Sequence, residues 1–194
     1  MLLTRGQLLE KHGLVDDAKE AYLRLVDFAK NNSDVSIFIY INEALNRLAD
    51  LEVDDLGKKE KYFRQLLKIS ISSDYRANKP LAKDFVEHSG FAMKRSEDII
   101  ADNILKYGKF LTDQKLYDEA LFLISEALTI AKQNDRRLSR VSSLYDVAGL
   151  CCWNVGKLEE AVEWGKKAMV HSNRFFNRDE YQFLYHLGMY LQVS

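Results

Sequence analysis

The side chains best suited to chemistry are four histidines and two cysteines, and their spacing matches no common catalytic or metal-binding motif. No His-x3-His, Cys-x2-Cys or His-Glu-x2-His pattern occurs, and neither a glycine-rich phosphate loop nor Gly-x-Ser-x-Gly is present. The nearest acid–base candidate is His171 with Asp179 or Glu180, but nothing in the spacing forces these residues together. We therefore expect no enzymatic activity, no metal and no cofactor. The histidines are His12, His88, His171 and His186.

The two cysteines, Cys151 and Cys152, are adjacent in the sequence. Neighbouring residues on a helix point about 100° apart, so a disulfide between them would be strained. Free cysteine is usually a small buried hydrophobe, and a vicinal redox switch is the alternative. The sequence opens without a cationic segment followed by an apolar run, and no apolar stretch approaches the roughly 18 residues of a membrane span. These features favour a cytoplasmic protein that does not contact a membrane.

Composition favours an all-helical chain. Of 194 residues, 28 are basic and 29 acidic, which gives a net charge of −1. A general polyanion binder typically has a pI above about 9, so we expect no direct contact with nucleic acid. Pro80 is the single proline, where average usage of about 5% predicts roughly ten. Turn-rich β-sandwiches and barrels are therefore disfavoured.

An internal repeat is the strongest signal in the sequence. Three pairs of small residues share one offset of 41 residues: Gly108 and Gly149, Ala120 and Ala161, and Ala127 and Ala168. A fixed period of this size is typical of arrays in which each unit buries its apolar face on its neighbours. Apolar residues at helical spacing lie on both sides of a predicted turn at 113–115, so each unit should contain two helices. The small residues would let these helices approach to about 8–10 Å.

This pattern resembles the tetratricopeptide repeat (TPR) family, in a variant whose period of about 40 residues exceeds the usual 34 or so. The residues that carry the resemblance are Gly6, Leu9, Gly13, Ala18, Tyr22 and Leu25 near the start; Ile104, Tyr107, Gly108, Leu111, Tyr117, Ala120, Ile124 and Ala127; Tyr145, Ala148, Gly149, Cys152, Gly156, Leu158, Ala161 and Ala168; and Leu187, Gly188 and Leu191. One departure is Gly165, beside Trp164, where the family has a large aromatic residue.

The resemblance implies an all-α fold, a right-handed superhelix (α-solenoid) of antiparallel helix pairs with about four to five TPR-like units. We expect a single domain over 1–194, with units at 1–31, 34–73, 97–133 and 138–173, an irregular helix at 78–95 and a half-unit at 179–194. Residues 34–95 fit the repeat less well, and the sequence leaves the structure of residues 70–96 open. The aromatic-rich last helix has no covering helix, which suggests a piece of a longer array and leaves self-association through that helix open.

In this family the first helices of successive units line a concave groove that receives a partner peptide or helix. Trp153 at one such position also suits packing between units. The resemblance therefore implies a protein-interaction module or scaffold. The alternative is the ligand- or peptide-sensing half of a bacterial regulator whose effector domain lies outside this chain. Chemistry by the repeats themselves is a third, weaker hypothesis. The groove positions carried over by alignment are Leu105, Lys109, Thr112, Asp146, Leu150, Trp153, Tyr185 and Met189.

Overall fold

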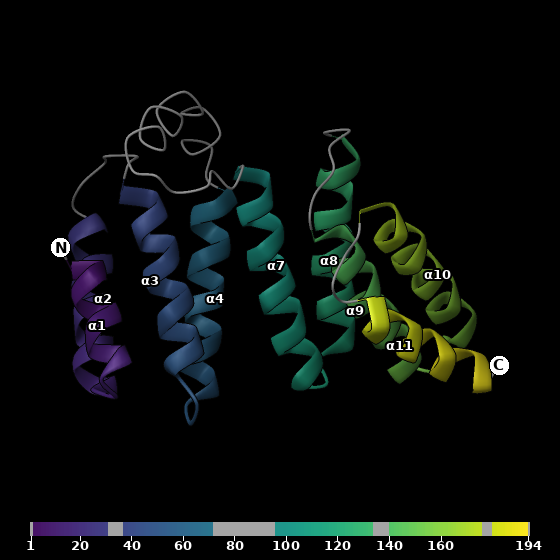
Figure 1. Ribbon diagram of the computed structural model, residues 1–194, viewed down its shortest axis with the longest axis horizontal. Helices are drawn as coiled ribbons and strands as arrows, with labels where there is room; N and C mark the ends of the chain where they lie inside the picture. The colour runs from purple at the N-terminus through teal and green to yellow at the C-terminus, as the bar shows by residue number, and fades with distance from the viewer. Residues whose placement is uncertain (1, 31–36, 72–95, 134–139, 176–179, 194) are drawn as a thin grey trace. The chain divides into compact units, whose positions relative to one another are not determined.

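The computed structural model describes residues 2–30, 37–71, 96–133, 140–175 and 180–193, and every element within these ranges is an α-helix (Figure 1). Contacts divide the chain into two compact units, Met1–Ser96 and Glu97–Ser194, which we describe separately. The irregular helix expected at 78–95 lies outside the described residues, so it stays a prediction.

The first unit is a series of helices in which each packs against the next. These helices are α1 (Leu2–Lys11), α2 (Val15–Lys30), α3 (Ile37–Leu51) and α4 (Leu56–Ile71). The turn after α1 contains Gly13, whose φ of +74° is a conformation that glycine adopts without strain. Asp16 and Asp17 lie in the first turn of α2, where the helix dipole favours negative charge.

Polar contacts join the helices of the first unit around Glu10, at the end of α1. Its carboxylate accepts a hydrogen bond of 2.8 Å from the Tyr22 hydroxyl of α2 and forms an ion pair of 3.3 Å with Arg47 of α3. Lys19 of α2 likewise pairs with Glu52, which directly follows α3, at 3.3 Å. These contacts fix the register of three consecutive helices.

The second unit contains five described helices: α7 (Ser96–Asp113), α8 (Tyr117–Gln133), α9 (Val141–Asn154), α10 (Leu158–Phe175) and α11 (Glu180–Val193). The predicted turn at 113–115 is confirmed, with Lys115 in the left-handed region at φ 63°. Side-chain contacts connect α7, α9 and α11 into one row: Thr112 with Cys151 at 3.3 Å, and Asp146 with His186 at 2.8 Å. Helix α10 packs on both α9 and α11, and α8 packs on α9.

The small residues of the repeat sit where paired helices meet. Gly6, Gly108 and Gly149 each precede a fully buried alanine by 12 residues, namely Ala18, Ala120 and Ala161. Tyr22 lies four residues after Ala18 and packs over Gly6 of the same helix pair. Ile124 lies four residues after Ala120 and packs over Gly108 in the same way. A Cβ atom added at Gly108 would lie 3.3 Å from Ile124 Cγ1, and one at Gly6 would lie 2.7 Å from Tyr22 Cδ1. The expected close approach is therefore present in both units.

The departure at Gly165 has a structural explanation. It occupies the position of Tyr22 and Ile124 in the third pair, and the space that it leaves is filled by Tyr190 of α11, which is 0% exposed. A Cβ atom added at Gly149 would lie 3.1 Å from Tyr190 Cε2, and one at Gly165 would lie 3.3 Å from Cδ2. The missing aromatic of one unit is thus supplied by the next helix along the chain.

Candidate functional site

The eight predicted groove residues occupy equivalent positions on α7, α9 and α11, all in the second unit. Each helix has a reference glycine, which is Gly108 on α7, Gly149 on α9 and Gly188 on α11. The candidates on α7 and α9 lie three residues before the glycine, one after it and four after it, and those on α11 occupy the first two of these positions. In that order they are Leu105, Lys109 and Thr112 on α7, Asp146, Leu150 and Trp153 on α9, and Tyr185 and Met189 on α11.

Two of these residues are buried. Leu105 and Asp146 stand three residues before their glycines, and neither presents its side chain to solvent. Asp146 Oδ1 lies 2.8 Å from His186 Nδ1 of α11, so this position of α9 faces the neighbouring helix of the row instead of an open groove. Tyr185, at the same position on α11, is 67% exposed. His186 itself was not predicted as a partner, although its separation of 40 residues from Asp146 is close to the repeat period.

The two remaining candidates on α7, Thr112 and Lys109, differ in exposure. The Thr112 hydroxyl donates a hydrogen bond of 2.8 Å to the Gly108 carbonyl and lies 3.3 Å from Cys151 Sγ, so it belongs to the packing between α7 and α9. Lys109 is exposed and offers a positive charge on the same face.

The other candidates form a partly exposed apolar surface on α9 and α11. Leu150, Trp153 and Met189 all pack against one buried cluster that includes Tyr190, and the ring centroids of Trp153 and Tyr190 are 6.5 Å apart. Trp153 therefore packs between neighbouring helices and still keeps part of its ring accessible. We call Leu150, Trp153, Tyr185 and Met189 the α9–α11 surface.

The two cysteines are poor nucleophiles. Both are buried with free thiols, and burial raises the pKa of each. Burial, with a further contribution from the nearby Glu160 carboxylate, raises the pKa of Cys152 to about 11. Both thiols are therefore protonated at neutral pH, which disfavours a redox switch because the thiolate is the reactive form.

The other chemical candidates have little support in the described parts of the chain. His171 lies in an edge-on arrangement with Tyr145 at 6.3 Å, while Asp179 is outside the described residues. Within those same ranges no three His, Cys, Asp or Glu side chains are placed to hold a metal ion. Nor does any described helix have the length and apolar character needed to cross a bilayer.

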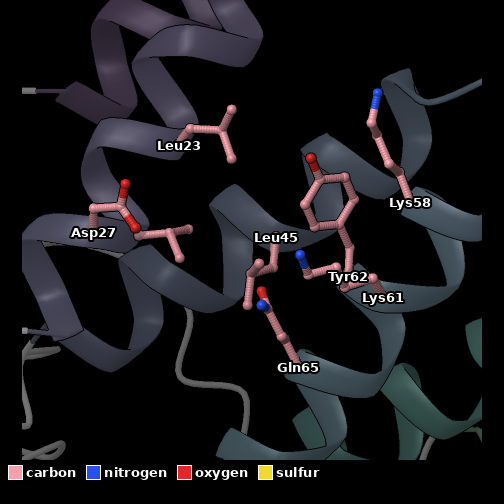
Figure 2. A pocket seen from close by; sticks show the side chains of 8 residues that line it. Leu23, Asp27, Leu45, Lys58, Lys61, Tyr62 and Gln65 are labelled. Carbon is pink, nitrogen blue, oxygen red and sulfur yellow. The ribbon is translucent and has the colours of Figure 1, made fainter.

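A hollow of about 200 Å³ in the first unit was not predicted from the sequence. Figure 2 shows side chains of α2 and α4 on its two sides and Leu45 of α3 between them. Ligand sites usually enclose about 300–1,000 Å³, so this hollow is small for a metabolite site. It lies between the second helices of two pairs, whereas the predicted groove uses first helices. The lining residues are Leu23, Val26, Asp27, Leu45, Lys58, Lys61, Tyr62 and Gln65.

Comparisons with known proteins find likeness in structure alone. No family model and no curated protein sequence matches the chain. The apo form of RapI superposes with a TM-score of 0.64 at 15% identity, over 97% of this chain and 46% of that one. TTC0263, a thermophilic TPR protein of Thermus thermophilus, gives a TM-score of 0.48 at 17% identity, over 98% of this chain and 80% of that one. BtubC from P. vanneervenii gives 0.47 at 17% identity, over 98% and 79%.

This chain therefore spans less than half the length of RapI. The sequential antiparallel pairs, the recurring contact between glycine and the covering helix, and the likeness to RapI together establish the fold class. The fold is an all-α, TPR-like helical repeat.

Proposed function

We propose that this chain binds a protein partner through the α9–α11 surface. Two observations carry the proposal: Tyr185, four residues before Met189 on α11, is 67% exposed, and the partly exposed Leu150, Trp153 and Met189 of α9 and α11 pack on one cluster. Aromatic and methionine side chains are enriched where proteins bind one another, and tyrosine and tryptophan are frequent at the energetic centre of such interfaces.

The side chains of this surface indicate the chemistry of the partner. Three of its four residues rest on a packed cluster, so they are held in place before binding and lose little conformational freedom when a partner docks. A peptide or helix with apolar anchors fits such a surface, and Lys109 on α7 would favour an acidic residue beside those anchors. We expect a short segment with one or two large apolar side chains and little positive charge.

The alternative function is the sensing half of a regulator. It draws on the likeness to RapI across 97% of this chain, a likeness that concerns the fold. A shared fold does not select a ligand, so this alternative requires a peptide ligand to be found before any effector is sought.

The proposal can be tested by selecting peptides from a displayed library on the full chain and measuring their affinity by calorimetry. Truncating an aromatic anchor at an interface commonly costs more than about 1 kcal/mol, so Tyr185→Ala should weaken a selected peptide by about tenfold. Met189→Ala should act in the same direction.

Phe122→Ala is the matched control, because Phe122 is an exposed aromatic on α8, outside the α9–α11 surface. It should leave the affinity unchanged. Equal affinities for the wild type and Tyr185→Ala, or equal losses for Tyr185→Ala and Phe122→Ala, would refute the assignment to this surface.

A further inference from the structure

Tyr185 differs from the other residues of the α9–α11 surface in how it is supported. Leu150, Trp153 and Met189 pack against the buried cluster around Tyr190, whereas Tyr185 is 67% exposed. A side chain with that much of its surface in water has few neighbours to restrict its rotamers, and ordering it on binding costs conformational entropy. A contact that orients Tyr185 before a partner arrives would therefore strengthen binding.

The ring contact of Tyr185 is with His186, the next residue along α11. The two ring centroids are 5.8 Å apart, and the ring planes are inclined at 57°. Aromatic rings prefer offset or edge-on arrangements with centroids about 4.5–7 Å apart. The imidazole of His186 is thus placed to limit the orientations of the Tyr185 side chain.

His186 is itself held from α9. The side chains of His186 and Asp146 are 12% and 3% exposed, and His186 Nδ1 lies 2.8 Å from Asp146 Oδ1. A carboxylate can only accept hydrogen bonds, so Nδ1 is the donor. Within the parts of the chain that the structure describes, this is the hydrogen bond that the His186 ring makes, and α10 supplies none to it. A carboxylate bonded to one ring nitrogen fixes the orientation of an imidazole.

The same pair also fixes the rotation of α11. His186 stands three residues after Phe183 and four before Tyr190, which are 1% and 0% exposed. Residues at this spacing share one side of a helix, so burial of the two rings brings His186 toward α9. The bond to Asp146 adds a directional contact, which apolar packing alone does not provide.

We propose that Asp146 and His186 are positioning residues for Tyr185 in partner binding, an inference that rests on the proposed function. Asp146 orients the imidazole from α9, and the imidazole holds Tyr185 in the orientation that the partner meets. Neither residue touches the partner. Asp146, predicted from sequence as a groove residue, thus acts on binding through two successive rings.

Conservative variants separate positioning from folding. His186→Asn places an amide nitrogen at the branch position of Nδ1, so it keeps the bond to Asp146 and removes the ring from Tyr185. It should stay folded by circular dichroism, while its affinity for a library-selected peptide should fall about three- to tenfold. Asp146→Asn keeps an oxygen that accepts from Nδ1, so its affinity should lie within about twofold of the wild type.

A double-mutant measurement tests the connection between Asp146 and Tyr185. Effects of residues that act through one another are not additive, whereas independent effects add. Asp146→Ala alone should weaken the peptide about threefold or more. In a chain that already carries Tyr185→Ala, adding Asp146→Ala should change the affinity by less than about twofold. Calorimetry compares the wild type, both single variants and the double variant at a temperature where circular dichroism shows each to be folded.

Asp102→Ala is the matched control. Asp102 of α7 forms an ion pair of 2.7 Å with Arg140, which precedes α9, so this variant also breaks a polar contact between helices of the second unit. It lies outside the α9–α11 surface and should leave the affinity for the peptide unchanged.

The outcomes distinguish this inference from the proposed function. Unchanged affinity of Tyr185→Ala would refute the proposed function and the positioning role together. A loss for Tyr185→Ala with additive losses in the double variant would overturn the positioning role alone, and so would undiminished binding by His186→Asn. Equal losses for Asp102→Ala and Asp146→Ala would also overturn it, because they would show that loosening the unit anywhere weakens binding.

Discussion

Replacing Tyr190 by alanine should be among the most destabilising single changes in the second unit. The ring is fully buried, and glycines stand against it on two sides, Gly149 on α9 and Gly165 on α10. Truncating a buried aromatic to alanine costs about 3–5 kcal/mol, with the larger values where neighbours cannot close the cavity. Glycines have no side chain that could move into the space. We therefore expect a loss of about 4–5 kcal/mol in the free energy of unfolding.

The assay is urea denaturation followed by circular dichroism, with hydrogen exchange of α9, α10 and α11 to confirm where stability is lost. Tyr190→Phe separates the ring from its hydroxyl, whose oxygen is buried without a hydrogen-bond partner among the described residues. That variant should lie within about 1 kcal/mol of the wild type, because removing an unsatisfied polar group costs little. Tyr181→Ala, an exposed tyrosine on the same helix, is the control for aromatic loss alone. A loss of unfolding free energy below about 2 kcal/mol for Tyr190→Ala, or equal losses for the alanine and phenylalanine variants, would refute the packing of the Tyr190 ring between the two glycines.

Three further predictions concern single positions. Gly6→Ala should destabilise the first unit by about 1–3 kcal/mol in urea denaturation, because the new methyl group would overlap the Tyr22 ring, and an unchanged midpoint would contradict this packing. The raised pKa of Cys152 means that folding favours the protonated thiol. The stability gained from this preference should be complete at pH values below 9.0, the ordinary pKa of the thiol, and should decline as the pH rises toward about 11. In a thiol-reagent assay at pH 8, the native protein should react far more slowly than the urea-unfolded chain, and equal rates would show that the thiols are accessible. Asp146→Ala should cost about 1–3 kcal/mol, since it leaves the largely buried His186 without its 2.8 Å partner, and a change below about 0.5 kcal/mol would show that the pair contributes little.

The helix pairs could be predicted from sequence because their contacts are local and repeated. Glycine and alanine at one fixed offset mark the close approach of two helices within a unit, and the turn at 113–115 follows from the apolar stripes on either side. The absence of a large residue at Gly165 was also visible.

The packing between units could not be predicted in the same way. Tyr190 fills the space beside Gly165 from a helix 25 residues further along the chain, and a motif that describes one unit does not specify such a contact. For the same reason, alignment placed Asp146 on the groove face of α9 but did not show that His186 of α11 lies against it.

The hollow in the first unit escaped prediction because its lining resembles ordinary helix surface. Lys58, Lys61 and Gln65 follow the spacing of a solvated helix face, and nothing in the sequence shows that they border a depression over Leu45. Only the packing of α2 and α4 on α3 creates it.

Hydrogen exchange of the full chain, with and without a library-selected peptide, tests the central claim most directly. The account predicts slowed exchange in α9 around Leu150 and Trp153 and in α11 around Tyr185 and Met189, with little change in the first unit. Protection confined to α2 and α4 around the hollow of the first unit, with none in α9 or α11, would contradict it.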